Sequence, residues 1–494
     1  MIFSAIPQLT KRKEAELIVL PFWEKQKKPK EAASLGTLDS AVKPLIDAGD
    51  FTGREGEVAF AYPKRGKEKR CLLLGLGREE HLTVNGLRQS YSNVAKECQK
   101  KGLKKINIVL PNIAQLTHVT VEEYLKGMAE GILLTNYRWE SLASLPEETV
   151  LLSQITVVGI LPKMLSVIKE ATLIAEGVHL ARDLINGNAD IVTPHYLAET
   201  ARKLAAKFPS LKATVFNKKR IEQEKMGLLL AVSRGSPNEP AFIILKYEGY
   251  PRSKDHTVLI GKGVTFDTGG LNLKPTGFME TMRADMSGAA AVLAAVASAA
   301  ALNLKHNVTA IVAATENSID GNSYKPGDVY KGYGGISVEV GNTDAEGRLT
   351  LADAISYCEK QLKPTRIIDF ATLTGSMVVA LGEQISGFFC NDNNLAHQLL
   401  DASQRSAEPL WQMPLFAPYR DLLKSDVADI KNVGGREAGA ITAALFLEEF
   451  VNKVPWAHVD IAGTAFESKE LGYWPKNAVG FGVRLMIDFL QHLE

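Results

Sequence analysis

The sequence has few cysteines and histidines, and their arrangement excludes several kinds of site. The four cysteines lie far apart and form no C-x-x-C pair, which argues against a structural zinc knot and against a disulfide framework. The nine histidines are scattered singly and form no H-E-x-x-H motif, so a histidine-based zinc site is poorly supported. This usage fits a reducing, cytoplasmic location best.

The chain also lacks an excess of charge of either sign. Its 57 basic and 56 acidic residues give a formal net charge of +1, so no whole-chain field favours nucleic acid or an anionic membrane. Two basic runs, at residues 24–31 and 62–70, could bind DNA locally. Exposed lysine-rich loops are more often simply solvated, so DNA binding is only a secondary hypothesis.

Export and membrane signals are weak. Charged residues at 11–14 interrupt the apolar N-terminal run, so no secretory signal is expected. The longest uncharged stretch, 287–304, is long enough to raise the question of a membrane span. Because it is mostly alanine, which has little transfer energy, we expect a packed core helix and no membrane contact.

Motifs for other kinds of chemistry are missing or incomplete. The sequence contains neither the G-x-S-x-G of a nucleophile elbow nor the G-x-x-x-x-G-K-[ST] of a phosphate loop. The run "LLLGLGREE" places Gly75 and Gly77 after a predicted strand but lacks the third glycine of a dinucleotide fingerprint.

The length of 494 residues and an apolar fraction of 46% are ample for two or three domains with large cores. Short apolar runs alternate with helical patterns up to about residue 160, which predicts a small α/β domain over 1–160. Helical spacing without a neighbouring strand predicts a connecting helix over 161–189. The remaining 190–494 would form a larger, catalytic domain.

Several apolar runs of the larger region are hydrophobic throughout, as is typical of central strands covered on both faces. The predicted strands are "GLLLAVSRG", "AFIILKYEG", "TVLIGKGVTFD", "NVTAIVAATEN", "RIIDFATLTG" and "WAHVDIAG". We therefore expect an α/β protein of two domains, each with a sheet covered by helices, and a mostly parallel central sheet in the larger one. Ligands of such sheets bind beyond the carboxyl ends of the strands.

Acidic residues gather in apolar surroundings in that region. In "NTDAEGRLTLADA", Asp344, Glu346 and Arg348 occupy alternate positions, and in an extended segment they would project together. Asp267 ends one predicted strand, and Asp285 precedes the alanine-rich helix. Four buried carboxylates need partners of opposite charge.

Two arrangements could supply those charges. Lys262, Lys274 and Arg348 could form a buried ion-pair network, or oxygen ligands could hold one or two divalent metals. A pair of metals could activate water for hydrolysis. The residues alone would not select Lys262 as a ligand, because an ammonium must lose its proton before it coordinates.

Five blocks, read in order, closely resemble the signatures of the cytosolic leucyl aminopeptidase family. They are "VLIGKGVTFDTGGLNLKP", "METMRADMSGAAAV", "ENSIDGNSYKPGDV", "VGNTDAEGRLTLADA" and "IDFATLTGSMVVALG". The resemblance continues to the C-terminus from about residue 180. Thr268 and Ser287 depart mildly from the usual pattern and put only fine substrate preference in doubt.

The resemblance implies a site for two divalent metals, zinc or manganese, with cobalt or magnesium as alternatives. Its five ligands would be Lys262, Asp267, Asp285, Asp344 and Glu346. By the same resemblance Asp267 and Glu346 bridge the two metals, Asp344 completes one site, and Lys262 and Asp285 complete the other.

Two further residues match catalytic positions of the family. Lys274 would stay charged and stabilise the oxyanion of the tetrahedral intermediate. Arg348 would hold a bicarbonate that acts as general base toward a water bridging the metals, because its planar guanidinium pairs bidentately with a planar anion.

The implied activity is hydrolysis of the first residue from peptides with a free N-terminus, with leucine and other apolar residues preferred. The apolar pocket for that side chain is assigned to Met282, Asn342, Ala345, Thr372 and Ala462. Family members resemble a ring of six subunits, so a homohexamer is expected. The alternatives are a di-metal phosphoesterase and a second role as a DNA-binding accessory protein.

Overall fold

The computed structural model describes residues 1–33, 35–112, 116–139 and 149–493. The chain divides into two compact units: residues 1–175 with 469–475, and residues 176–468 with 476–494. The boundary falls inside helix α4 (Leu165–Asn186), which covers most of the predicted connecting segment 161–189. The sequence did not predict that 469–475 leaves the larger unit, because contacts so distant along the chain leave no local pattern.

Unit 1 is built on a seven-stranded sheet in the order β1-β7-β6-β2-β5-β4, with β3 paired to β2. The path from β1 to β5 is parallel, and β4 is antiparallel. The strands are β1 (Ile2–Ile6), β2 (Leu17–Trp23), β3 (Lys30–Glu31), β4 (Val58–Ala61), β5 (Cys71–Gly75), β6 (Lys105–Val109) and β7 (Gln154–Val158). The principal helices are α1 (Asp39–Ala48), α2 (Val84–Lys100) and α3 (Val121–Thr135).

Unit 2 contains an eight-stranded sheet in the order β16-β15-β18-β14-β10-β11-β9-β8. Its four central strands, β18, β14, β10 and β11, are mutually parallel. The strands are β8 (Leu211–Phe216), β9 (Ala241–Glu248), β10 (His256–Asp267), β11 (Asn307–Asn317), β14 (Arg366–Ala371), β15 (Ser386–Cys390), β16 (Leu410–Gln412) and β18 (Trp456–Asp460). This is the predicted α/β class with a mostly parallel centre.

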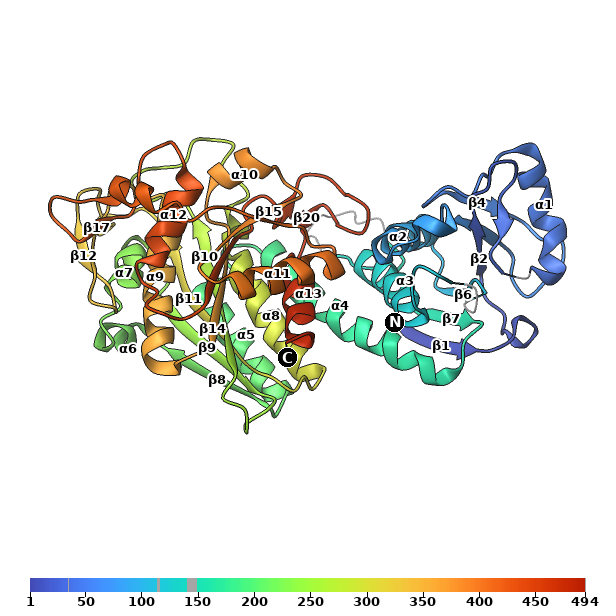
Figure 1. Ribbon diagram of the computed structural model, residues 1–494, viewed down its shortest axis with the longest axis horizontal. Helices are drawn as coiled ribbons and strands as arrows, with labels where there is room; N and C mark the ends of the chain where they lie inside the picture. Colours follow the sequence, from blue (N-terminus) through green and yellow to red (C-terminus); the bar gives the residue numbers. More distant parts are fainter. Residues whose placement is uncertain (34, 113–115, 140–148, 494) are drawn as a thin grey trace. The chain divides into compact units, whose positions relative to one another are not determined.

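Helices cover both faces of this sheet (Figure 1). On one face α8 (Ser287–Ala301) packs on β10, β11 and β14, with α13 (Val483–Gln491) and α11 (Asn393–Ser406) beyond it. On the other face α9 (Gly347–Tyr357) packs on β10 and β11, with α7 (Gly227–Val232) and α12 (Gly439–Glu448) beside it. Further helices are α5 (Pro194–Lys207), α6 (Lys218–Gln223) and α10 (Gly375–Leu381).

Small sheets complete unit 2. One joins β12 (Val329–Lys331), β13 (Ser337–Glu339) and β17 (Ile430–Lys431). The other pairs β19 (Phe466–Glu467) with β20 (Asn477–Ala478). The first matters for the site, because β17 leads directly into Asn432.

One predicted strand is wrong. Residues 227–235, "GLLLAVSRG", form α7 and a short 3-10 turn. Leucine and alanine are strong helix formers, and the Asp353 carboxylate accepts hydrogen bonds from the free amides of Leu228 and Leu229 at 3.0 and 2.9 Å. Capping of this kind by a residue more than 100 positions away is invisible in a short window of sequence.

The alanine-rich stretch is a core helix, as expected. Among the described residues, 282–301 is the helical segment long and apolar enough to cross a membrane, and 94% of its apolar window is buried inside the protein. Fourteen of the fifteen residues of α8 are buried. Small side chains let the helix lie close to the sheet: a Cβ on Gly288 would lie 2.0 Å from the Phe370 carbonyl oxygen.

Candidate active site

Strand β10 carries Lys262 in its middle and Asp267 at its carboxyl end. Residues five apart in a regular strand point to opposite faces. Pairing with β11 shifts, however, from Val264 opposite Thr315 to Asp267 opposite Asn317, which inserts one extra residue. This β-bulge turns Asp267 to the same face as Lys262.

The other acidic residues lie where helices begin. Asp285 is in a 3-10 turn (Met282–Met286) directly before α8, and Glu346 directly precedes α9. Carboxylate oxygens of Asp267, Asp344 and Glu346 all lie within 4.8 Å of one another. The structure therefore brings together residues that are up to about 80 positions apart in the sequence.

The expectation of an extended segment at 344–348 is wrong. Residues 343 and 344 form a turn, in which the Asn342 side-chain oxygen accepts a hydrogen bond from the Asp344 amide at 2.8 Å. Asparagine stabilises such turns through this local bond. Arg348 lies in the first turn of α9, so a turn and a helix present the charged residues, and strand alternation does not.

The predicted ligands and Lys274 form a dense ionic cluster. Lys262 Nζ lies 2.7 Å from Asp285 Oδ1 and 2.8 Å from Glu346 Oε1, and it donates to the Thr372 carbonyl oxygen at 2.9 Å. Lys274 Nζ lies 2.8 Å from Asp267 Oδ2 and 2.6 Å from Asp344 Oδ1. All four carboxylates therefore lie beside a lysine.

Burial and mutual repulsion shape the protonation of the acids. Burial raises the pKa of Asp267 to about 6, and the Glu346 carboxylate adds to the rise, against the effect of Lys274. Burial also raises the pKa of Asp285 and of Asp344. For Glu346, burial is outweighed by Lys262 and Lys274, which lower its pKa.

Both lysines stay protonated in this ionic arrangement. Burial lowers the pKa of Lys262, but the carboxylates of Asp285, Glu346 and Asp267 outweigh it and raise the pKa above its usual value. The same balance raises the pKa of Lys274. Lys262 and Lys274 therefore form the buried ion pairs that the sequence allowed, whereas Arg348, the third predicted partner, bonds to the Asn432 carbonyl oxygen and pairs with none of these carboxylates.

Two asparagines that were not among the predicted site residues hold the acids in place. The Asn317 side chain donates to Asp267 Oδ1 at 2.8 Å and to the Thr343 carbonyl oxygen at 3.0 Å. Neighbouring Glu316 points to the opposite side and binds Ser236 and Asn238. The signal for Asn317 was its position at the carboxyl end of a central strand.

Asn432 is fully buried and ties two parts of the site together. Its side-chain nitrogen donates to the carbonyl oxygens of Asn342 and Ala345 at 2.7 and 3.2 Å, and its side-chain oxygen accepts from the Gly341 amide at 2.7 Å. Its own carbonyl oxygen accepts a bond from Arg348 Nη1 at 2.8 Å. Nothing in the local sequence indicates these contacts.

Close packing at Gly347 brings Lys262 against the start of α9. A Cβ at this position would lie 2.4 Å from Lys262 Cε and 2.8 Å from Nζ. A glycine is therefore required at the first position of α9 if the Lys262 side chain is to reach Asp285 and Glu346.

The predicted side-chain pocket residues are only partly joined by contacts. Thr372 is part of the ionic cluster, because its hydroxyl donates to Asp285 Oδ1 at 2.7 Å. Asn342 and Ala345 are held by Asn432. Met282 begins the 3-10 turn that carries Asp285. The Ala462 amide bonds to Asp460 Oδ1 at 3.1 Å, and Asp460 also accepts from Thr374 at 2.7 Å.

The donor set fits divalent cations. Within the described residues, the buried oxygens Asp285 Oδ2 and Glu346 Oε2 have no hydrogen-bond partner. A buried acceptor without a partner is costly, and a cation would satisfy both atoms. Four carboxylates and one potential amine form the oxygen-rich ligand set that zinc, manganese or magnesium accept.

Comparisons with known proteins identify the family. The catalytic-domain model of the cytosol aminopeptidase family matches residues 179–487, and its N-terminal-domain model matches residues 19–144. A probable cytosol aminopeptidase of Chlamydia abortus is 51% identical over 497 residues, 99% of each chain. The corresponding protein of Protochlamydia amoebophila is 48% identical over 498 residues, 100% of this chain and 99% of the relative.

Solved structures show the same fold over nearly the whole chain. A mutant of tomato leucine aminopeptidase is 32% identical with a TM-score of 0.89, covering 99% of this chain and 96% of the tomato chain. The bottromycin maturation enzyme BotP in complex with Mn is 32% identical with a TM-score of 0.86, covering 97% and 99%. On the extent of these matches, this chain belongs to the cytosol aminopeptidase family of metal-dependent peptidases and is an aminopeptidase, a hydrolase.

Proposed function

We propose that the chain removes the N-terminal residue from peptides with two divalent metal ions, and prefers leucine and other apolar residues. The observation that carries the proposal is the convergence of Lys262, Asp267, Asp285, Asp344 and Glu346, with two buried carboxylate oxygens left without partners among the described residues. The manganese complex of BotP and the leucine aminopeptidase of tomato support it by similarity.

Those five residues would hold the two ions, zinc or manganese, or alternatively cobalt or magnesium. Bound divalent ions of this kind lower the pKa of water and polarise a carbonyl group. Lys262 can act as a ligand only as a neutral amine. Two adjacent divalent charges favour that form and so oppose the effect of the neighbouring carboxylates.

Lys274 serves the reaction as a fixed positive charge. Its side chain is 15% exposed, so its ammonium group is accessible to a bound substrate, and its carboxylate neighbours raise its pKa. An ammonium so placed would stabilise the negative charge that develops on the peptide carbonyl oxygen.

Arg348 would anchor bicarbonate as the general base. One guanidinium nitrogen, Nη1, is fixed by the Asn432 carbonyl oxygen, while Nε is buried without a partner among the described residues. Burial lowers the pKa of Arg348 to about 10, which still leaves it charged at neutral pH. A charged guanidinium group that still has a hydrogen-bond donor to offer is suited to bind a planar anion.

Substrate choice would follow from the free amine and an apolar pocket. Met282, Asn342, Ala345, Thr372 and Ala462 are proposed to line the pocket for the first side chain. Apolar pockets separate neighbouring sizes by only about 1–3 kcal/mol, so leucine would be preferred without being exclusive. The family description and the absence of cysteine pairs support a cytoplasmic location.

Hydrolysis of leucine p-nitroanilide by purified protein tests this proposal. The protein is stripped with a chelator and reloaded with Mn²⁺ or Zn²⁺. Activity should return with metal, should disappear in Lys262→Ala, and should be absent with N-acetylated substrate. Activity that survives chelation, or equal hydrolysis of the acetylated substrate, would refute the proposed use of metal and of a free amine.

A further inference from the structure

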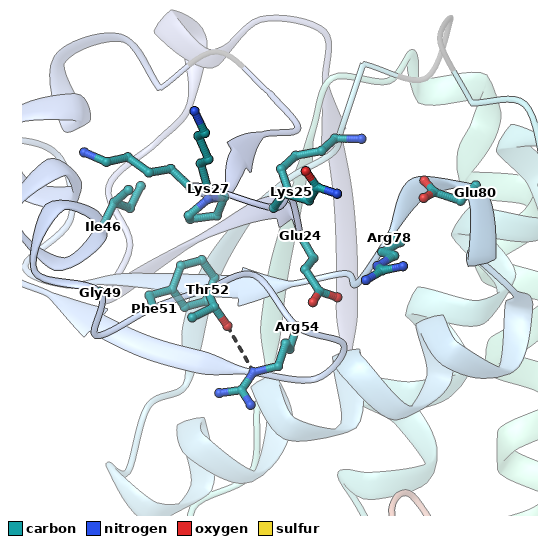
Figure 2. A pocket seen from close by; sticks show the side chains of 13 residues that line it. Glu24, Lys25, Lys27, Ile46, Gly49, Phe51, Thr52, Arg54, Arg78 and Glu80 are labelled. Carbon is teal, nitrogen blue, oxygen red and sulfur yellow. Dashed lines mark hydrogen bonds between the residues drawn. The ribbon is translucent and has the colours of Figure 1, made fainter.

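Unit 1 contains a cavity whose residues play no part in the proposed hydrolysis. It has a volume of about 570 Å³, within the range of about 300–1,000 Å³ typical of small-molecule sites. Three segments line it: the residues after β2, the end of α1 with the loop that follows it, and the residues after β5 (Figure 2). The basic run at 24–31 supplies most of the first segment, and the glycine run at 75–77 directly precedes the third.

The cavity lies where an α/β sheet usually binds ligands. β2 and β5 are parallel neighbours, and their final residues Trp23 and Gly75 lead directly into lining segments. Ligands in open parallel sheets bind beyond the carboxyl ends of the strands. The position of the cavity therefore matches a functional location of the fold.

Backbone hydrogen bonds fix the three segments to one another. The Glu24 amide donates to the Gly77 carbonyl oxygen at 2.9 Å, and the Gly77 amide donates to that of Gly53 at 3.0 Å. Glu57 Oε2 holds the intervening loop by accepting from the amides of Thr52 and Arg54, each at 3.0 Å. Hydrogen bonds between and within the loops therefore hold the rim of the cavity in place.

Glycine permits this close approach. A Cβ on Gly75 would lie 2.0 Å from the Arg54 carbonyl oxygen, and Gly53 has a φ of +82°. Both positions require glycine if the loop that carries Arg54 is to lie against the end of β5.

Positive charge dominates the lining. Lys25, Lys27, Arg54 and Arg78 have no ion pair among the described residues, whereas Lys28 pairs with Asp47 at 2.7 Å. Two acids, Glu24 and Glu80, also line the cavity, which leaves an excess of two positive charges. The Glu80 backbone amide, together with Lys25, His81 and Arg78, lowers the pKa of Glu80.

The lining also has an apolar part. Figure 2 shows Ile46 and Phe51 on one side of the view and Arg78 on the other, with Lys25 and Lys27 on the segment after β2. Arg54 Nε donates to the Thr52 hydroxyl at 3.0 Å, which orients its guanidinium group. Cationic side chains from separate loops could bind the anionic groups of a ligand, while the carbon skeleton of the ligand contacts Ile46 and Phe51.

We propose that this cavity binds a small anionic molecule that carries at least two phosphate or carboxylate groups. Four cations from three linked loops suit two separate anionic groups, and arginine pairs bidentately with either kind. The volume, which is that of a small-molecule site, favours a small molecule over DNA, which binds along extended basic surfaces. The site is independent of the hydrolytic site and of its metals.

Calorimetric titration of the full chain at physiological salt tests the proposal. The probes are pyrophosphate, citrate, ATP and a short DNA duplex. One small probe should bind with one site per chain: pyrophosphate for a phosphate ligand, citrate for a polycarboxylate. ATP binding more tightly than pyrophosphate would show that the apolar side contributes.

Matched double variants locate the site. Arg54→Ala/Arg78→Ala should weaken binding by about tenfold or more, the loss expected for charge-assisted bonds. Lys64→Ala/Arg65→Ala removes the same charge from an exposed run outside the cavity and should leave affinity within twofold. Basal peptide hydrolysis should be unchanged in both variants. If the first variant unfolds at a lower temperature than the wild type, Lys25→Gln/Lys27→Gln provides a second test of the cavity.

Three results would overturn the proposal. The first is no binding of any small probe at about 1 mM. The second is an equal loss in the cavity and control variants, which would indicate unspecific charge. The third is tight binding of the duplex without binding of a small probe, which would make this face a DNA-binding surface.

Discussion

At the scale of single residues, the site depends on side chains that hold the ligands as much as on the ligands. Asn432 shows this most clearly, since one buried side chain fixes the backbone at Asn342 and Ala345 while its own carbonyl oxygen orients Arg348. Partners of this kind tune metal ligands and are often nearly as important as the ligands themselves.

Asn432→Ala should weaken metal binding and lower kcat/KM by about 10- to 100-fold, because the backbone at Asn342 and Ala345 on either side of Asp344 loses its buried hydrogen-bond donor. Asn432→Asp keeps the acceptor for the Gly341 amide but turns a buried carboxylate oxygen toward the carbonyl oxygens of Asn342 and Ala345, so it should lose at least as much as the alanine variant. Asn452→Ala, at an exposed asparagine whose side-chain nitrogen donates to Glu359, is the control. Metal titrations that match the wild type would contradict this role.

The buried pair of His458 and Asp369 predicts a pH-dependent stability. Their side chains lie 2.6 Å apart on neighbouring strands. Burial lowers the pKa of His458, but the charge and hydrogen bond of Asp369 outweigh it and raise the pKa above its usual value. A histidine with a raised folded pKa stabilises the protein fully below its unfolded pKa, and this stabilisation is lost as pH rises through the folded pKa.

His458→Gln should therefore lose most stability at acid pH. Breaking a buried pair costs about 3–5 kcal/mol, and the deficit should shrink as pH rises above about 6.5 through the folded pKa. Urea unfolding of both proteins at about pH 6 and about pH 9 measures it. A deficit that grows toward alkaline pH would show that the histidine is neutral in the folded protein.

The predictions for single residues came partly from composition and spacing and partly from family resemblance. Composition and spacing identified a group of carboxylates and cations, but the choice of Lys262 as a ligand came only from family resemblance. The structure brings all five residues together. Asn432 could not be predicted, because its partners lie about 90 residues away and asparagine at that position carries no local pattern.

At the scale of secondary-structure elements, the site is placed by a bulge and two helix starts. Without the extra residue in β10, Asp267 would face away from Lys262. Long apolar strands such as β10 and β11 were predicted correctly because their hydrophobic runs are continuous. The strand predicted at 227–235 failed because tertiary capping by Asp353 selects a helix, and the 344–348 alternation failed because Asn342 favours a turn.

Contact between α9 and β10 depends on Gly347. Gly347→Ala would place a Cβ 2.4 Å from Lys262 Cε, so we expect a loss of about 1–3 kcal/mol in unfolding free energy, as for other overpacked sites. A large decrease in aminopeptidase activity should accompany it, because Lys262 must move. Gly321→Ala, with no atom within 4 Å of the added Cβ, is the matched control. Full activity in Gly347→Ala would contradict the close packing of this pair.

At the scale of the whole molecule, two units are interleaved in sequence. Residues 469–475 belong to unit 1, where Tyr473 bonds to Asn85 at 3.0 Å and Glu470 pairs with Lys96 at 2.5 Å. Local patterns predict the two α/β regions but not this return of the chain. The cavity of unit 1 could not be predicted either, because the three segments that line it are separated along the sequence.

We also propose that the chain assembles as a homohexamer, which rests on resemblance to the family and on no feature of a single chain. Light scattering coupled to gel filtration should then give a mass about six times 53.8 kDa. A monomeric mass at micromolar concentration, with activity retained, would exclude the hexamer as the working form.

Metal stoichiometry tests most directly whether the ionic cluster is a two-metal site. Metal-free protein is dialysed against Mn²⁺ or Zn²⁺, and bound metal is counted by elemental analysis beside Lys262→Ala and Asp267→Asn. The predicted result is two ions per wild-type chain and fewer in both variants. A folded wild-type protein that binds no metal would show that Lys262 and Lys274 are the permanent partners of these carboxylates.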